Sequence, residues 1–101
     1  DLLNRHPDLR GIYCAGGGME GAIAALREVR QPGEVTLVVN ELTPESRAAL
    51  ISRYVGMAIA TPLSKLCADL VTVAAEAVRD GITPLQGQHF LQPDLYLPES
   101  V

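Results

Sequence analysis

The feature that most constrains the fold is the alternation of short apolar segments with helical patterns between residues 11 and 80. Apolar runs cover residues 11–15, 35–39 and 55–60, and each has the length of a buried strand. Between these runs, apolar residues recur three and four positions apart, as they do on one face of a helix. The continuous apolar character of the runs is typical of strands covered on both sides. We therefore predict an α/β fold of order βαβαβαβ, a parallel sheet with helices on both faces.

Capping signals define where the later helices begin and end. Thr43 and Thr61 are predicted N-caps, and each precedes a proline that fits the first helical position. The two helices are expected to run to about residue 53 and to a stop at Gly81. Beyond it, the tail from Leu85 to Leu97, with Pro93 inside it and Pro98 after it, is expected to form one or two short strands near a sheet edge.

Composition excludes several classes of protein. The chain has 101 residues, enough for one small domain, and its net charge of −4 without any basic run argues against a nucleic-acid surface. No apolar stretch is long enough to span a bilayer and no signal peptide is visible. Cys14 and Cys67 lack the spacing of a metal site or disulfide framework, so we expect two buried free thiols and a reducing compartment. Because the chain starts at Asp1 inside an apparent helix end, we expect a piece of a longer protein.

Ligands of parallel sheets bind outside the carboxyl ends of the strands. Three predicted loops lie there, at residues 16–20, 40–42 and 61–63. No nucleophile elbow, metal cluster or pair of carboxylates in one loop is present, so the sequence indicates neither an enzyme nor a metal or other cofactor. Any function is expected to be ligand binding in these loops.

The first of these loops also fits a dinucleotide-binding pattern. Gly16, Gly18 and Gly21 have the G-x-G-x-x-G spacing, and Glu41 lies about twenty residues further on. However, Glu41 is displaced beyond the second strand, and Glu20 adds a negative charge where a pyrophosphate would bind. A P-loop is excluded because no Lys-Ser or Lys-Thr follows the glycines. A dinucleotide-dependent oxidoreductase therefore stays as a second alternative.

Four segments together resemble the effector-binding domain of the LacI/GalR family of bacterial transcription regulators and its periplasmic sugar-binding relatives. Residues 3–15 resemble the helix, turn and strand that enter the C-terminal lobe of that domain. Residues 35–45 resemble the strand and loop carrying an acidic ligand-binding residue. Residues 58–63 resemble the strand that crosses between lobes, and residues 94–100 resemble the C-terminal strand.

The resemblance implies a type I periplasmic-binding-protein-like fold. Residues 1–61 would form most of the C-terminal lobe, and residues 62–81 a crossover helix that packs on a lobe absent from this chain. Residues 82–101 would supply the C-terminal strands. An isolated chain would then leave the apolar face of the crossover helix exposed.

The resemblance also implies the site. The glycine loop would stand where the family presents Asn-Asp to sugar hydroxyls, so backbone N–H groups would be the donors and a bulkier or more anionic ligand would fit. Glu41, beside Asn40, would accept hydroxyl hydrogen bonds, and Thr61 would stand where Gln or Asn is common. The implied ligand-binding residues are Gly16, Gly17, Gly18, Asn40, Glu41 and Thr61.

Each of these residues also has a structural interpretation. The glycines can serve a tight turn, Glu41 can be a solvated loop carboxylate, and Thr61 can be a cap. Tyr13 is expected to pack in the sheet. His6 and His89 are isolated and are expected to be surface or satisfied histidines.

The functional prediction is an effector-binding domain of a LacI-family regulator. A sugar or related small polar molecule would bind between two lobes, and lobe closure would control DNA binding. We expect a cytoplasmic homodimer without membrane contact, with DNA bound only through a domain absent from this chain. The first alternative is the sugar-binding component of an ABC transporter.

Overall fold

The computed structural model describes residues 1–80 and 90–101. Its internal contacts divide the chain into two compact units. The first comprises Asp1–Ala60 with Leu95–Val101, and the second comprises Thr61–Asp94. The predicted helix stop at Gly81, the start of the predicted tail strands and His89 lie outside the described residues.

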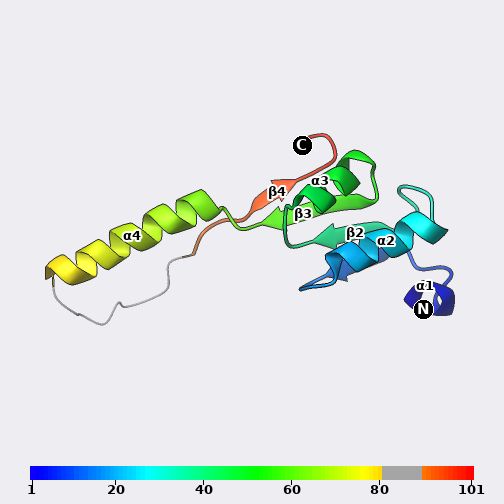
Figure 1. Cartoon of the computed structure of the whole chain (residues 1–101), viewed down its shortest axis with the longest axis horizontal. Coiled ribbons are helices and arrows are strands. Elements are labelled where there is room, and N and C mark those ends of the chain that lie inside the picture. The colour runs from blue at the N-terminus through cyan, green and yellow to red at the C-terminus, as the bar shows by residue number, and fades with distance from the viewer. Residues whose placement is uncertain (81–89) are drawn as a thin grey trace. The chain divides into compact units, whose positions relative to one another are not determined.

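Helices and strands alternate along the chain as predicted (Figure 1). The first three strands begin and end within about one residue of their predicted bounds. The elements are α1 (Leu2–Arg5), β1 (Gly11–Cys14), α2 (Met19–Val29), β2 (Thr36–Val39), α3 (Pro44–Ile51), β3 (Val55–Ala60), α4 (Leu63–Asp80) and β4 (Asp94–Tyr96).

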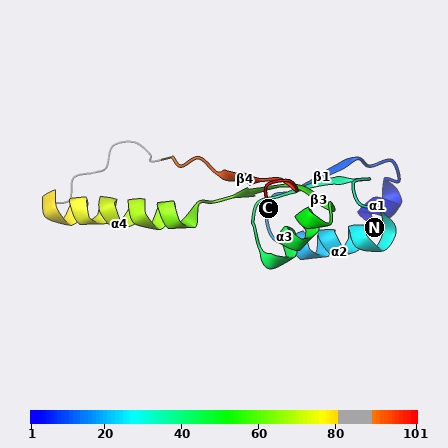
Figure 2. The same cartoon turned by 90° about the horizontal axis from the view of Figure 1, so that it is seen from above.

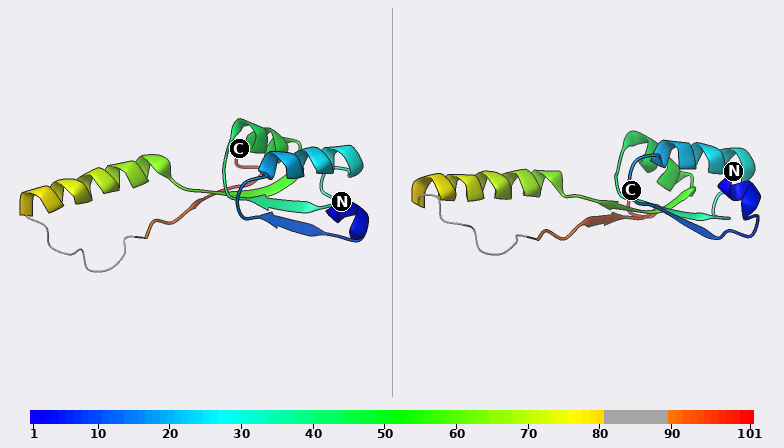
Figure 3. Two further views of the ribbon diagram at one scale, coloured as in Figure 1. Left: turned by 60° about the horizontal axis from the view of Figure 1, so that its bottom comes forward. Right: turned by 90° about the horizontal axis from the view of Figure 1, so that it is seen from below.

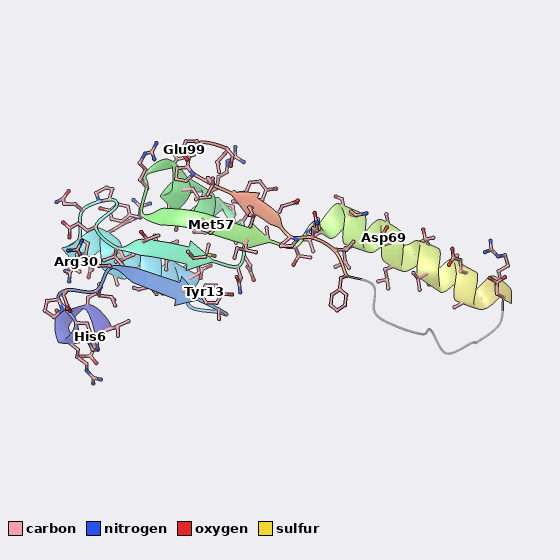
Figure 4. All side chains as sticks on the ribbon, turned by 180° about the vertical axis from the view of Figure 1, so that it is seen from behind. His6, Tyr13, Arg30, Met57, Asp69 and Glu99 are labelled. Carbon is pink, nitrogen blue, oxygen red and sulfur yellow. The ribbon has the colours of Figure 1, made fainter. Side chains whose placement is uncertain are left out.

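The four strands form one mostly parallel sheet in the order β1-β2-β3-β4. Tyr13 pairs with Val38, and Val38 pairs with Met57, in two parallel ladders. The arrow of β4 points against those of the other three strands, so the sheet is mixed at this edge (Figure 4). The predicted α/β sheet is therefore confirmed for β1, β2 and β3, while β4 departs from the parallel direction.

Helices α2 and α3 lie on the same face of the sheet (Figures 2 and 3). The reason is the strand order: β1, β2 and β3 follow one another in one direction, and right-handed crossovers then place both connecting helices on one side. Helices were predicted on both faces of the sheet, and in the first unit α2 and α3 both cover the same face.

The core of the first unit lies between that face and the two helices. Strand β2 alternates, with Leu37 and Val39 fully buried and Val38 on the opposite face. Leu26 of α2 and Leu50 of α3 are also buried against this cluster. The opposite face carries Tyr13, Val38 and Met57 in one row across three strands, and Figure 4 looks onto it.

The register between β2 and β3 shifts by one residue at Gly56. Leu37 pairs with Val55, but Val38 pairs with Met57, so Gly56 is the extra residue of a bulge. A Cβ atom at Gly56 would lie 2.8 Å from Cγ2 of Thr36. The glycine therefore lets β3 approach β2 closely at this point.

Helix α3 ends in a turn whose left-handed residue is an arginine and not a glycine. Arg53 has a φ of 68°, its N–H donates to Leu50 O over 3.1 Å, and the N–H of Tyr54 donates to Ala49 O over 2.9 Å. This pair of bonds is the Schellman arrangement, in which glycine is the preferred left-handed residue. The side chain of Arg53 reaches the C-terminal segment, where its Nη1 lies 3.0 Å from Oε1 of Glu99.

We expect Arg53→Gly to raise the pKa of Glu99 without lowering the free energy of unfolding at pH 7. The Arg53 hydrogen bond is the main reason that the pKa of Glu99 lies below its ordinary value. A carboxyl whose pKa is depressed by folding stabilises the fold above its unfolded pKa, and that contribution is lost as the pH falls through the folded pKa. Replacing Arg53 with glycine removes this contribution of Glu99 to stability, but it also relieves the strain of a left-handed backbone at a non-glycine residue. The two effects oppose each other at pH 7.

An NMR titration of the Glu99 carboxyl carbon measures this effect. Arg53→Lys is the control, because it keeps a positive charge near Glu99 and is expected to retain part of the pKa depression. A Glu99 pKa that is the same in Arg53→Gly and in the wild type would contradict the prediction.

The second unit contains α4, and none of the residues of this helix is buried. Most of its apolar side chains are exposed instead, with Val78 reaching 86%. Cys67 is also exposed and Cys14 is half-buried, so the prediction of two buried thiols is wrong. Cys67 is exposed because none of the described residues of this unit buries the helix face that it shares with the apolar residues of α4. Among the described helices, none is long and apolar enough to cross a membrane.

Candidate functional site

The candidate site lies where β1 and β2 end at the same edge of the sheet. The loop that follows β1 carries the glycines, and the loop that follows β2 begins with Asn40 and Glu41. Because the two strands are parallel neighbours, these loops meet and enclose a cavity of about 160 Å³. The lining residues are Gly16, Gly17, Met19, Glu20, Asn40 and Glu41.

The structure thus brings together four of the six predicted site residues. Gly18 is adjacent in sequence to this set and forms the N-cap of α2, with a left-handed φ of 94°. Thr61 belongs to the second unit and is described separately below. A cavity of this size is smaller than the roughly 300–1,000 Å³ of complete small-molecule sites, so it suits one edge of a small ligand.

Asn40 connects the carboxyl ends of the two strands through both ends of its side-chain amide. Its Nδ2 donates to Ala15 O over 3.0 Å, and its Oδ1 accepts from the hydroxyl of Tyr13 over 3.0 Å. A backbone carbonyl can only accept, so the amide nitrogen must face Ala15. The orientation of the amide follows from its partners.

Beneath the glycine loop, two side chains hold it against the sheet. Met19 opens α2 and is buried in the core. The thiol of Cys14 lies 3.7 Å from the carbonyl oxygens of both Gly16 and Gly17, within range of weak S–H bonds. Of the loop glycines, Gly18 alone has a left-handed backbone that requires glycine.

Glu41 is held at its backbone by the cap of α3. Ser46 is fully buried, and its hydroxyl donates to Glu41 O over 2.9 Å while accepting from the N–H of Thr43 over 2.8 Å. The hydroxyl of Thr43 in turn accepts from the N–H of Ser46, which completes a capping box. The predicted Thr43 cap is therefore confirmed, with Pro44 at the start of the helix. The side chain of Glu41 is exposed, and no described residue hydrogen-bonds to its carboxylate.

Two carboxylates share the cavity, and this arrangement was not evident from the sequence. Glu20 comes from the first turn of α2 and Glu41 from the loop after β2. Their combined charge disfavours an anionic ligand, although the glycine loop alone leaves room for one. The sequence could have indicated this pair, because the loops after β1 and β2 were predicted to lie at the same edge of a parallel sheet.

The glycine pattern lacks the geometry that a dinucleotide-binding loop needs. In such loops the third glycine allows a close approach between helix and strand. Here a Cβ atom at Gly21 would meet nothing within 4 Å, and the same holds for Gly16. Together with the carboxylate of Glu20 in the cavity, this openness argues against a pyrophosphate at the start of α2.

Thr61 does not form the predicted cap of α4. The carbonyl of Pro62 accepts the first helical hydrogen bond, from the N–H of Leu66 over 2.9 Å, so Pro62 stands at the cap position and Thr61 lies before it. The hydroxyl of Thr61 makes no hydrogen bond to another described residue. Its role as a ligand contact stays a prediction.

Three solved structures are similar to the chain along nearly all of its length. A glucose-galactose binding protein (GanP) from Geobacillus stearothermophilus has a TM-score of 0.82 at 14% identity, over 99% of this chain and 35% of its own. A mutant XylFII–LytSN complex has a TM-score of 0.79 at 11% identity, over 96% of this chain and 38% of its own. A protein from Bacteroides fragilis assigned to the LacI transcriptional regulators has a TM-score of 0.78 at 15% identity, over 98% of this chain and 34% of its own.

These likenesses concern the fold. No protein-family model and no curated protein matches the chain. The chain spans about a third of the length of the three similar structures. Its fold is that of a type I periplasmic-binding-protein-like domain, as the resemblance of the four sequence segments implied.

Proposed function

We propose that the chain binds a neutral sugar or polyol at the carboxyl ends of β1 and β2, as part of an effector-binding domain. The observation that carries the proposal is the cavity in which Asn40 and Glu41 meet the glycine loop. The Glu41 carboxylate would accept a hydrogen bond from a ligand hydroxyl, and the Asn40 amide would contact a neighbouring hydroxyl. Gly16, Gly17 and Gly18 would leave space for the ligand.

The charge of the cavity supports a neutral ligand over a phosphorylated one. Glu20 and Glu41 both line it, and no lysine or arginine does. A hydroxyl can donate to a carboxylate, whereas a phosphate has only acceptor oxygens at neutral pH and would be repelled. Sugar phosphates and uronic acids are thus expected to be excluded.

The biological role that we propose is regulation of transcription in the manner of the LacI family. Ligand binding would shift the population of closed lobes, and a cytoplasmic homodimer would transmit the shift to DNA-binding heads outside this chain. No catalytic step is part of this proposal. The likeness to a protein assigned to the LacI regulators supports it.

A second candidate role is the binding component of a sugar transporter. The likeness to a glucose-galactose binding protein favours it. The sequence encoded before Asp1 separates the two roles, because a helix-turn-helix there supports the regulator and a signal peptide supports the transporter.

An NMR titration of the chain with neutral monosaccharides and polyols tests the proposed site. We expect saturable shifts of the backbone signals of Gly16, Gly17, Asn40 and Glu41, and no such shifts with glucose 6-phosphate. Glu41→Gln is expected to weaken binding by about five- to tenfold, because the amide oxygen can still accept the hydrogen bond but no longer carries the charge that strengthens it.

Glu28→Gln is the matched control, because Glu28 is an exposed carboxylate of α2 that does not line the cavity. It makes the same change of charge and is expected to leave the affinity unaltered. The proposal is overturned if no neutral sugar or polyol gives saturable shifts, or if the phosphorylated sugar binds as well as the neutral ones.

A further inference from the structure

We propose that Tyr13 is a positioning residue for ligand binding: its hydroxyl orients the Asn40 amide that the ligand contacts. This inference rests on the proposed function. The sequence predicts that Tyr13 packs in the sheet, but the structure leaves it 59% exposed on the face opposite the helices. Among the described residues, the only hydrogen bond of its side chain is the one from its hydroxyl to Oδ1 of Asn40 over 3.0 Å.

The register of the sheet explains why these two residues meet. Tyr13 pairs with Val38, and Asn40 lies two positions beyond Val38, at the diagonal position. A residue two positions along a strand shares its face, and a diagonal neighbour is within reach of an aromatic side chain. The long tyrosine ring therefore spans from the end of β1 to the first residue of the loop after β2.

The hydrogen-bonding capacity of Asn40 shows what remains for a ligand. An amide side chain has two N–H donors and two oxygen lone pairs. Ala15 O takes one N–H, and the Tyr13 hydroxyl takes one lone pair. Asn40 lines the cavity with one donor and one acceptor left over, and both have directions set by the two occupied positions.

A free donor beside a free acceptor matches a particular ligand group. Two adjacent hydroxyls can accept from the N–H and donate to the oxygen at the same time, whereas an anionic oxygen can use only the N–H. Tyr13 would thus favour ligands with neighbouring hydroxyls by holding both Asn40 groups in place before the ligand arrives.

The test is a double-mutant cycle on binding of a neutral sugar that the titration identifies. Tyr13→Phe removes the hydroxyl and keeps the ring, and it is expected to weaken binding by about three- to tenfold, the worth of one net hydrogen bond. Asn40→Ala is expected to weaken binding at least as much. The double variant should bind no more weakly than Asn40→Ala alone, because Tyr13 acts only through Asn40.

Tyr54→Phe is the matched control, since its hydroxyl also makes one hydrogen bond, to Arg30 O over 3.2 Å, but does not line the cavity. It should leave sugar affinity unchanged. A readout without ligand is the pair of side-chain amide signals of Asn40, which are expected to move in Tyr13→Phe and not in Tyr54→Phe.

Three outcomes overturn the inference. Unchanged Asn40 signals in Tyr13→Phe would mean that the hydrogen bond is not formed. Additive effects in the cycle would mean that Tyr13 contacts the ligand directly. If the Asn40 signals move in Tyr13→Phe but the chain binds no sugar or polyol, the proposed function itself is rejected. The hydrogen bond would then have only a structural role.

Discussion

Replacing Leu50 with alanine is expected to lower the free energy of unfolding by about 2–5 kcal/mol, the range for removal of a buried leucine side chain. Leu50 is 0% exposed and packs from α3 into the cluster that fills one face of the sheet. Small domains have total stabilities of about 5–15 kcal/mol, so this loss would remove a large share of the free energy of unfolding. Urea unfolding followed by circular dichroism measures it.

The neighbouring residue gives the control for this prediction. Ile51→Ala removes a side chain of similar size from the same helix, but Ile51 is 62% exposed. We expect its effect to stay within about 0.5 kcal/mol, as for most surface substitutions. Equal losses in the two variants would show that α3 does not pack on the sheet as described.

Gly56→Ala is expected to lower the free energy of unfolding by about 1–3 kcal/mol, because its new methyl group would overpack the contact between β2 and β3. The Cβ atom would stand 2.8 Å from Cγ2 of Thr36, well inside van der Waals contact. Thr36 is β-branched, so its side chain has few other positions to adopt.

A second substitution tests the cause of that loss. Thr36→Ser removes Cγ2, and in the Gly56→Ala background it should recover most of the lost stability. Gly21→Ala is the contrasting control: its methyl group meets nothing within 4 Å, and alanine in a helix is favoured by about 0.5–1 kcal/mol over glycine. A Gly56→Ala chain as stable as the wild type would contradict the described bulge.

The strands and helices of the first unit were predictable because their signals are local. The strand Val55–Ala60 was predicted with its observed bounds, since its apolar run is continuous and has clear ends. The start of α3 was predicted from Thr43 and Pro44, whose chemistry satisfies the free N–H groups of a helix. Such features depend on residues a few positions apart.

Three features without a local sequence signal were missed. The bulge at Gly56 and the left-handed Arg53 have no local signal, because a glycine in a strand has several roles and arginine is not a turn residue. The direction of β4, opposite to that of the other strands, is not encoded in its three residues.

The candidate site was predictable in its location and less so in its contacts. The carboxyl edge of a parallel sheet indicated where Asn40 and Glu41 would lie relative to the glycine loop. The hydrogen bond from Tyr13 to Asn40 requires the register of β1 and β2, which the apolar pattern specifies only to the nearest alternate residue. Thr61 was predicted as the cap of α4, but the first helical hydrogen bond goes to the carbonyl of Pro62, one residue later. The sequence pattern does not specify which carbonyl accepts this bond.

The first unit is assembled from two stretches of chain, residues 1–60 and 95–101, and this has a consequence for synthesis. On a ribosome, β1, β2 and β3 emerge well before β4, so the outer edge of β3 has no neighbouring strand while residues 61–94 are being made. An uncovered strand edge can pair with another nascent chain. Yet the cost of closing the intervening segment rises only with the logarithm of its length. The segment can therefore lengthen during evolution at little cost to stability, whereas any delay in synthesising residues 95–101 prolongs the exposure of the β3 edge.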